Sequence, residues 1–538
     1  MFRKLALTIF LTIVLIGTLG EVSKTQTVQT SGTIYIKSDG NIEPPTASIQ
    51  RLGNTYIFND NINDSIVIQK DHIVVDGAGY TLQGAGNRTG IYLTGRSNVT
   101  IKNIEIKAFD YDIELYYSSN NTVSGNNMTN SEYGIRLYGS SNNTVSGNNM
   151  TNSEYGIRLH DSSNNTVSGN NIAANYAQGI WLRESSNNTL SGNHVKANNS
   201  YGIFFVESSG NTVSGNNVAA NHSNGILIIE YSKNNIISGN NITQNESIGI
   251  ALSTSSNNTV SGNNIANNGN CGVGLYWSSN NNSVYGNNIT ANEFAGILFF
   301  QSSNNTVSGN NIANNGNYGL LLNMSSNNKF YHNHFTDNPN QVYVEVNSTN
   351  AWDDGYPSGG NYWSDYAEKY PNAEEMDESG VWNIPYTIDE NNQDRYPLIS
   401  PLGIITRLFI VYVDNQAYQV KTVSNSSISA FNLSRSQKQI SFNVTTSSGT
   451  ICFCNITIPS NLLWGEFTVL LDGEPQMFSI RKDNATHISV YFTCSHDTKK
   501  IQIIGTDIIA EFMSLAILSL FIIATLFAVM VCRRKHSI

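Results

Sequence analysis

A ten-residue segment that returns at nearly constant spacing constrains this chain more than any other feature. The segment from Ser118 to Asn127, SSNNTVSGNN, recurs with small changes every 22 to 24 residues, and its last copy begins at Ser325. Such self-similarity indicates a solenoid. Common helical repeats are longer and contain less Gly, Asn and β-branched sequence. We therefore expect an all-β protein whose main body is a right-handed parallel β-helix with 22 to 24 residues in each coil.

Alternating apolar residues identify the interior of the predicted coils. Ile135 and Leu137 are two apart, so on a strand they share one face, and the equivalent residues of the other units are also apolar. Val123 and Met128 begin two further apolar columns. We expect these four columns to line the inside of the β-helix.

One Asn occupies the same position in every unit. If coils stack about 4.8 Å apart, each side-chain amide can donate to one neighbour and accept from the other. The sequence therefore predicts an internal Asn ladder, whose members are Asn126, Asn148, Asn170, Asn193, Asn216, Asn240, Asn263, Asn287, Asn310 and Asn333.

The two ends of the chain predict export and membrane anchoring. Arg3 and Lys4 precede an apolar run, which is the layout of a signal peptide. Residues 512–532 are uncharged and long enough to cross a hydrocarbon core of roughly 30 Å, and Arg533 follows them. We expect the large N-terminal portion to face outward. More than twenty Asn-x-Ser/Thr sequons, such as Asn221, are consistent with that compartment.

Composition changes along the chain suggest seven segments. The aromatic-rich stretch after the last repeat can cover the open end of the core, and the alternating strands after it suggest a small β-sandwich. The predicted segments are a signal peptide (1–22), an N-terminal cap with first coils (30–90), the β-helix repeats (91–346), a C-terminal cap (347–402), a juxtamembrane β-sandwich (403–506), a transmembrane helix (508–532) and a cytoplasmic tail (533–538).

The repeat resembles an archaeal and bacterial β-helix family that includes NosD-like periplasmic proteins and the carbohydrate-binding and sugar-hydrolase repeat domains. The resemblance covers residues 71–347. It implies the fold strongly, whereas activity has to be argued from the site itself.

Large and charged side chains at outward positions suggest a ligand site. Aromatic rings on an exposed strand face commonly mark a binding surface, and the acidic residues at the strand ends form a column of like charges. The predicted ligand-binding residues are Arg136, Tyr138, Arg158, His160, Asp161, Trp181, Arg183, Glu184, Phe204 and Glu207. We expect a non-catalytic, cell-surface protein that binds a polysaccharide, with Ca²⁺ as a possible bridge.

Three alternatives remain open at this stage. A hydrolase or lyase would use carboxylates such as Asp161, Glu184 and Glu207, but their regular column lacks the distinct environments that separate an acid from a base. A purely structural surface protein is the second. The NosD resemblance implies a copper-associated protein as the third.

Several residues are candidate metal ligands. His332 and His334 are two apart, and Cys452, Cys454, Cys494 and His496 offer a copper or zinc site, although a disulfide from Cys494 to Cys452 or Cys454 is the simpler interpretation. Asp389, Asn391 and Asp394 are candidate calcium ligands, without the regular loop of a common calcium site.

The charge excludes one broad class. The formal net charge is −11 and basic residues are scattered, so the concentrated basic surface that nucleic-acid binding needs is missing. No P-loop, HExxH or nucleophile-elbow motif occurs.

Overall fold

The structure is a computed structural model that describes residues 32–345, 348–356, 359–376, 381–399, 405–413, 416–424, 426–446, 452–482, 486–494 and 497–508. The predicted signal peptide and cytoplasmic tail lie outside these residues, and so does the predicted transmembrane helix except for its first residue. Among the residues that are described, no helix has the length and apolar character needed to cross a membrane.

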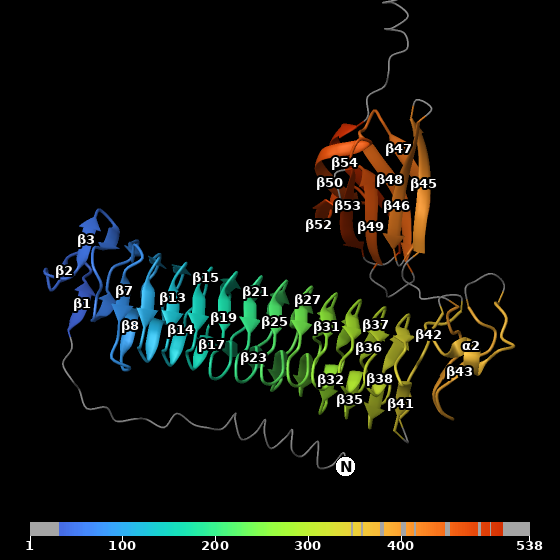
Figure 1. The fold of residues 1–538 in the computed structure, drawn as a ribbon, viewed down its shortest axis with the longest axis horizontal. Coiled ribbons are helices and arrows are strands. Elements are labelled where there is room, and N and C mark those ends of the chain that lie inside the picture. Colours follow the sequence, from blue (N-terminus) through green and yellow to red (C-terminus); the bar gives the residue numbers. More distant parts are fainter. Residues whose placement is uncertain are drawn as a thin grey trace, which may run out of the picture.

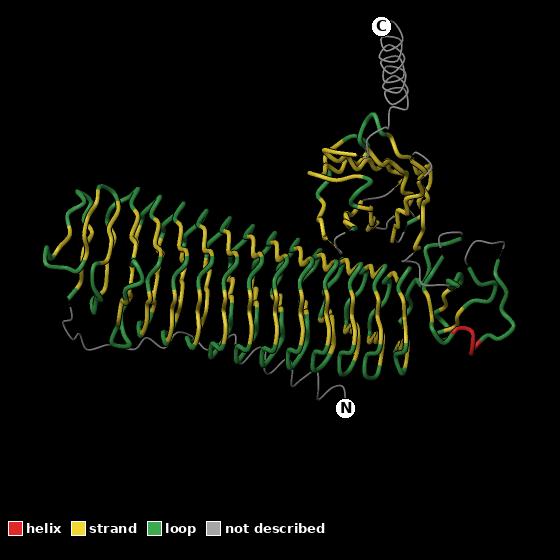
Figure 2. Tube along the Cα trace, turned by 45° about the horizontal axis from the view of Figure 1, so that its top comes forward, coloured by secondary structure: helices red, strands yellow, loops and turns green. Residues whose placement is uncertain are grey.

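Residues 32–399 form a long parallel β-helix with a cap at each end, and residues 405–508 form a separate β-sandwich (Figure 1). One coil illustrates the repeat, with strands β11 (Tyr111–Tyr116), β12 (Thr122–Ser124) and β13 (Asn127–Thr129). Short turns join the three strands, and the chain then rises to the next coil (Figure 2). The predicted right-handed parallel β-helix is confirmed.

Equivalent strands of successive coils build three long sheets, which we call A, B and C. They contain 15, 14 and 13 strands, respectively. Sheet B runs through strands such as β12 to β39 (Lys329–Tyr331), and sheet C runs from β7 (Thr81–Gln83) to β40 (His334–Thr336) and ends at β42 (Tyr362–Trp363). The strands of sheet A that follow β11 are β14 (Tyr133–Tyr138), β17 (Tyr155–His160), β20 (Ile180–Arg183), β23 (Ile203–Val206), β26 (Ile226–Ile229), β29 (Ile250–Ser253), β32 (Cys271–Tyr276), β35 (Ala295–Phe300), β38 (Tyr318–Asn323) and β41 (Asn340–Val344).

The coils stack in the predicted register. Ile135 pairs with Ile157, and Ile157 pairs with Ile180, without any shift between coils. Ile135, Leu137, Val123 and Met128 are all fully buried, as the alternation of the sequence predicts. Their columns merge into one continuous core that reaches from the N-terminal cap to the C-terminal cap.

The predicted Asn ladder is confirmed, and its hydrogen bonds all run in one direction. The backbone and side-chain nitrogens of Asn126 both donate to Oδ1 of Asn148, each over 3.0 Å, and each rung repeats this contact with the next. Three parallel ladders were not predicted. They include Asn121, Ser118 and Ser153, and they also donate from each coil to the following one.

The N-terminal cap closes one end of the core with two short antiparallel pairs. Strand β1 (Thr33–Ile36) pairs with β2 (Ile42–Glu43), and β3 (Ile49–Leu52) pairs with β4 (Thr55–Phe58). Tyr56 and Phe58 cover the first coil and are essentially fully buried. This cap therefore ends the solenoid without leaving an open apolar surface.

The C-terminal cap covers the other end with aromatic rings around the four-residue helix α2 (Tyr366–Lys369). Trp352 and Trp363 are 1% exposed and belong to the same core as the coils. The Trp363 ring stacks between Phe335, at 4.6 Å, and Tyr386, at 4.2 Å between ring centroids. The aromatic-rich segment thus seals the core, as its composition suggests.

Two residues that the sequence suggested as calcium ligands lie at the ends of Asn ladders. The ladder of Asn126 finishes at Asn361, whose backbone N–H donates to Oδ2 of Asp394 over 2.7 Å. The ladder of Asn121 finishes at Asn392, whose amide donates to both carboxylate oxygens of Asp389. A carboxylate only accepts hydrogen bonds, so it can end a row of donors without needing a further partner.

The β-sandwich consists of two five-stranded antiparallel sheets around a core of its own. The first sheet contains β45 (Ile405–Val413), β46 (Gln416–Ser424), β49 (Cys452–Pro459), β53 (His487–Cys494) and β52 (Phe478–Lys482). The second contains β47 (Ser427–Ser434), β48 (Gln439–Thr446), β54 (Asp497–Ile508), β50 (Leu463–Leu471) and β51 (Glu474–Pro475).

Candidate functional site

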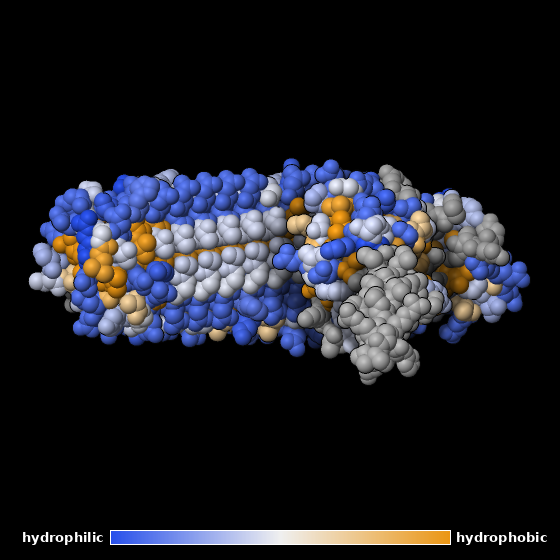
Figure 3. All heavy atoms as spheres, turned by 90° about the horizontal axis from the view of Figure 1, so that it is seen from above, coloured by the Kyte–Doolittle hydropathy of each residue, from blue (hydrophilic) through white to orange (hydrophobic). Residues whose placement is uncertain are grey.

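The outer face of sheet A carries the residues that the sequence predicted as a ligand site. Arg136 pairs with Arg158, Arg158 with Trp181, and Trp181 with Phe204 across neighbouring strands. A second outward column reads Tyr138, His160 and Arg183. The predicted residues are therefore brought together, although only some of them face solvent. Figure 3 views the molecule from the side of sheet B and not from the side of sheet A. On this side, uniform columns of residues with intermediate hydropathy run along the β-helix between columns of hydrophilic residues.

Neighbouring side chains cover part of the predicted site. Arg158 is only 4% exposed, its Nη1 donates to the Tyr133 hydroxyl over 2.9 Å, and its guanidinium lies 4.1 Å from the Trp181 ring centroid. Phe204 is buried in an apolar cluster on the outside of the sheet. The expectation that Arg158 donates to a ligand and that Phe204 is exposed was therefore wrong, because neighbouring side chains already cover them.

Aromatic rings form two columns along the coils. Tyr133 stacks between Tyr111, at 5.0 Å, and Tyr155, at 4.6 Å between centroids. In the other column Tyr116 stacks on Tyr138 at 5.1 Å. The guanidinium of Arg136 lies between the columns, close to Tyr111 and Tyr138 and 3.4 Å from Glu114. These contacts hold the polar face rigid.

Tyr117 offers an open ring that the sequence analysis missed. It lies directly after β11 with a φ of 47°, and it is 58% exposed. A Cβ atom on Gly139 would come within 2.5 Å of its ring carbons, so the ring lies over a position that has no side chain. The rings of Tyr116 and Tyr138 lie against it at nearly right angles. The Tyr-Tyr pair before the turn, followed one coil later by Gly139, was the available signal.

The acidic column is present at the same turns. Asp161, Glu184, Glu207 and Glu230 are exposed, and each has a φ between 49° and 54°. The left-handed backbone costs a residue with a Cβ roughly 1–2 kcal/mol. Four consecutive coils therefore keep a carboxylate where Asn or Gly would strain the backbone less.

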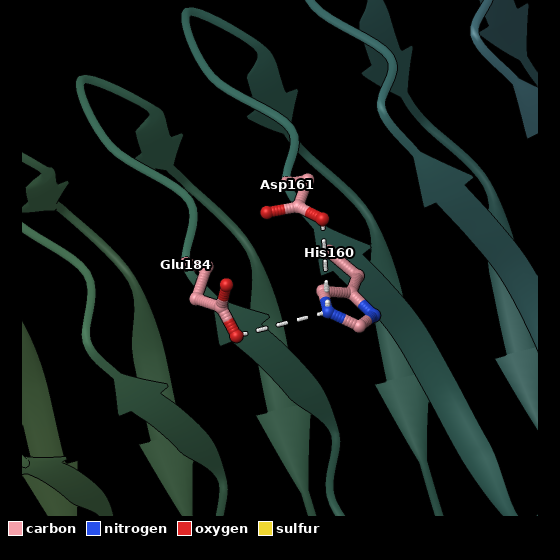
Figure 4. Close-up of side chains that lie close together, drawn as sticks. All are labelled: His160, Asp161 and Glu184. Carbon is pink, nitrogen blue, oxygen red and sulfur yellow. Dashed lines mark ion pairs between the residues drawn. The ribbon is translucent and has the colours of Figure 1, made fainter.

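His160 lies between two of these carboxylates. Its Nε2 is 3.9 Å from Oδ2 of Asp161 and 3.9 Å from Oε1 of Glu184, which comes from the next coil (Figure 4). The three ligand atoms lie within 4.8 Å of one another, and no other cluster of this kind occurs in the described part of the chain. We call Tyr117, Tyr138, His160, Asp161, Arg183 and Glu184 the edge site.

Burial lowers the pKa of His160 below its usual range, and the positive charge of Arg158 acts in the same direction. The imidazole is therefore neutral at pH 7, with a lone pair available to a cation or a hydrogen-bond donor. Arg183 Nε donates to Oε1 of Glu184 over 3.1 Å, which offsets part of the negative charge.

The cysteines of the β-sandwich do not offer the thiolate pair that the sequence allowed. Cys494 is disulfide-bonded, and the strand register places Cys452 directly opposite it. Cys454 is a free, buried thiol whose pKa burial raises to about 12. A thiol that stays protonated binds metal poorly. His496 lies outside the described residues.

The two nearby histidines occupy different positions in the repeat. His334 pairs with Asn311 in sheet C, whereas His332, with a φ of 57°, takes the turn position that Gly309 fills in the preceding coil. The repeat therefore gives each histidine its own structural position, His332 in a turn and His334 in a strand of sheet C.

Comparison with known proteins identifies the family. Residues 63–248 and 227–368, together more than half of the chain, match the family model described as periplasmic copper-binding protein (NosD). No curated protein sequence matches the chain.

Several solved structures match the chain at low sequence identity. The mannuronan C-5 epimerase AlgE6 A-module of Azotobacter vinelandii is 16% identical, with 54% of this chain and 89% of that chain covered and a TM-score of 0.43. The periplasmic alginate epimerase AlgG is 16% identical over 59% and 84%, with a TM-score of 0.44. The Dettilon tailspike protein is 13% identical over 82% and 87%, with a TM-score of 0.38.

The strands of sheet A from β11 to β41, whose outer face carries the edge site, lie within the matched region. The chain belongs to the NosD family of periplasmic copper-binding proteins.

Proposed function

We propose that the edge site binds a polysaccharide without cleaving it. The observation that supports this most directly is the exposed ring of Tyr117, which lies beside a row of polar side chains. The apolar face of a sugar ring can pack on such an aromatic face, while its hydroxyl groups reach hydrogen-bonding partners. His160, Asp161 and Glu184 supply acceptors, and Arg183 supplies donors.

The rigidity of the surroundings favours binding. The Tyr117 ring packs against the stacked rings of Tyr116 and Tyr138, so little conformational freedom is lost when a sugar packs on it. The groove of a catalyst would need an acid and a base in different environments. Asp161 and Glu184 instead occupy the same position on successive coils, and both are exposed. This symmetry is the reason for proposing a binding protein.

The test is a glycan array probed with the full-length protein. Tyr117→Ala should abolish retention of the bound glycan, because it removes the open ring. Tyr231→Ala is the matched control, since Tyr231 is 70% exposed and also left-handed, in the turn after a sheet A strand five coils further on. Unchanged binding by Tyr117→Ala would contradict the proposal, and release of reducing sugar by the wild-type protein would contradict the absence of catalysis.

Copper binding is a second candidate function, supported by the donor set of the edge site. Cu²⁺ accepts imidazole nitrogen together with carboxylate oxygen, so the donor types of His160, Asp161 and Glu184 fit it. A bound copper ion would supply a positive charge between the two carboxylates. Because burial lowers the pKa of His160, its imidazole is neutral at pH 7 and can bind a cation through the ring nitrogen that carries no proton.

Titration with Cu²⁺, followed by electron paramagnetic resonance, separates this candidate from glycan binding. His160→Ala should remove the signal of nitrogen coordination, whereas Glu207→Gln, one coil beyond the cluster, should leave it unchanged. Absence of stoichiometric copper uptake by the wild-type protein would exclude this candidate and leave the proposal on Tyr117 standing.

A further inference from the structure

At the turn from sheet A to sheet B, one column of exposed asparagines begins Asn-x-Ser/Thr sequons. Asn98, Asn120, Asn142, Asn164 and Asn187 occupy it on five consecutive coils, and each is followed two residues later by Thr. Asn257, Asn281 and Asn304 occupy it further along, with Thr or Ser at the same spacing. All eight are exposed, with φ between 56° and 59°.

The backbone holds these residues while their side chains stay available. The N–H of Asn164 donates to Ser186 O over 3.1 Å, and the N–H of Asn187 donates to Ser209 O over 3.0 Å, so the turn is fixed by the next coil. In the part of the chain that is described, the side-chain amides of Asn120, Asn164 and Asn257 make no hydrogen bond, and the three residues are exposed.

Three other sequons of the repeats are unavailable in the folded protein. Asn198, Asn221 and Asn245 also begin Asn-x-Ser sequences, but they are at most 1% exposed. Their Nδ2 atoms donate to the next rung of an internal ladder over 2.9, 2.9 and 3.0 Å. A sugar on any of these nitrogens would break the ladder and could not fit inside the coil.

We infer that the turn column is N-glycosylated. The co-reactant is an oligosaccharide attached to a lipid phosphate. A bond forms between Nδ2 of the asparagine and the anomeric carbon of the first sugar, and the bond from that carbon to the lipid phosphate breaks. The lipid phosphate leaves with the electron pair of that bond, and the proton lost by Nδ2 passes to a base of the enzyme that transfers the oligosaccharide. This inference rests on the predicted export of the chain, and it does not depend on the proposed glycan binding.

The geometry limits the pattern of modification. Coils rise by about 4.8 Å, which is less than the width of a sugar ring, so neighbouring asparagines of the column cannot all carry glycans. In two consecutive coils this column has no sequon, because Gly210 replaces the asparagine in one and Ile236 replaces the threonine after Asn234 in the other. The glycans of this column should therefore form two groups, with an open stretch of the column beside Glu207 and Tyr231.

Glycans in the first group lie close to the edge site. Asn164 and Asn187 follow Asp161 and Glu184 by three residues in the same turns. An attached sugar there should compete with an external polysaccharide. Protein made in a host without N-glycosylation should then bind a glycan array more strongly than protein from the native host.

The test is glycopeptide mass spectrometry of the full-length protein purified from its native host. We expect sugar on members of the turn column, at incomplete occupancy, and none on Asn198, Asn221 or Asn245. Absence of glycan from every turn asparagine would overturn the inference, and so would a glycan on a ladder asparagine of folded protein.

Two matched substitutions make the test independent of folding. Thr259 faces outward on sheet B, so Thr259→Ala should remove the glycan from Asn257, whereas Thr259→Ser should keep it. Ile236 is 45% exposed, and Ile236→Thr completes a sequon with Asn234 in the open stretch. This variant should gain a glycan at Asn234. Failure to gain it, in protein that carries sugar elsewhere, would show that the turn geometry is not what selects the sites.

Discussion

The two asparagines at positions 263 and 264 allow a sharp test of the internal ladder. Asn263 is 1% exposed, and its side chain makes four hydrogen bonds. Nδ2 donates to Ile237 O and to Asn287 Oδ1, and Oδ1 accepts from the backbone and side-chain nitrogens of Asn240, all over 2.9 Å. Asn264 is exposed and makes two side-chain bonds on the surface of sheet C.

Asn263→Ala removes four buried hydrogen bonds at about 1 kcal/mol each and leaves the Asn240 N–H without an acceptor. We expect a loss of about 4–6 kcal/mol in the local free energy of unfolding. Asn264→Ala removes two solvent-exposed bonds that water can replace, so its cost should stay below about 1 kcal/mol.

Native-state hydrogen exchange is the appropriate assay, because a repeat array can open locally and need not unfold in one step. The backbone amide of Asn240 should lose most of its protection in Asn263→Ala and little of it in Asn264→Ala. Urea unfolding followed by circular dichroism provides an independent measure. Equal destabilisation by the two substitutions would refute the idea that the buried ladder, and not asparagine content as such, stabilises the coils.

Three further predictions follow from buried groups. Burial raises the pKa of Asp394 to about 7, so the folded state holds the proton of this side chain more tightly than the unfolded chain does. The stability of the C-terminal cap should therefore fall as pH rises from about 4 to about 7. Trp363 fluorescence during unfolding should report this loss, and Asp394→Asn should remove the pH dependence. Gly156→Ala should lower the melting temperature strongly, since its Cβ would lie 2.4 Å from Gly179 O and from Ile172 Cγ2. Gly169→Ala, whose Cβ would have nothing within 4 Å, should cost only the roughly 1–2 kcal/mol of a left-handed backbone. Similar losses of stability in the two variants would contradict the close packing around Gly156. Arg158→Ala should destabilise the protein by about 2–3 kcal/mol through lost packing on Trp181 and the lost bond to Tyr133, as measured by chemical denaturation, and an unchanged midpoint would mean that Arg158 is not part of the packing.

The repeat made the fold predictable from the sequence, because each unit reports the same environment many times. Ile135, Val123 and Met128 share their apolar character with every equivalent residue, so their burial followed from alternation alone. The Asn126 ladder followed in the same way. The ladders of Asn121 and Ser118 were missed, although these residues recur in turns as Asn126 does, because Asn and Ser are common in turns simply because their side chains bond to the nearby backbone.

The candidate site was only partly predictable, because it depends on how neighbouring side chains share one face. Arg158 and Trp181 were identified correctly as outward residues, yet each uses the other as a packing partner, and strand alternation cannot show this. Tyr117 was missed because its exposure depends on Gly139, which lies one coil away. Asp389 and Asp394 were interpreted as metal ligands because a carboxylate suits the end of an Asn ladder as well as it suits a bound cation.

The one-way direction of the Asn ladders also bears on how a protein of this kind changes length. Every rung presents the same donors forward and the same acceptor backward, so insertion or removal of a whole coil by gene duplication or deletion leaves each junction chemically unchanged. Only the ends of the ladders are irreplaceable, since Asp389 and Asp394 must accept hydrogen bonds from the last Asn of each ladder, however many coils precede it. Such solenoids are therefore free to lengthen or shorten during evolution while their two carboxylate stops stay where they are.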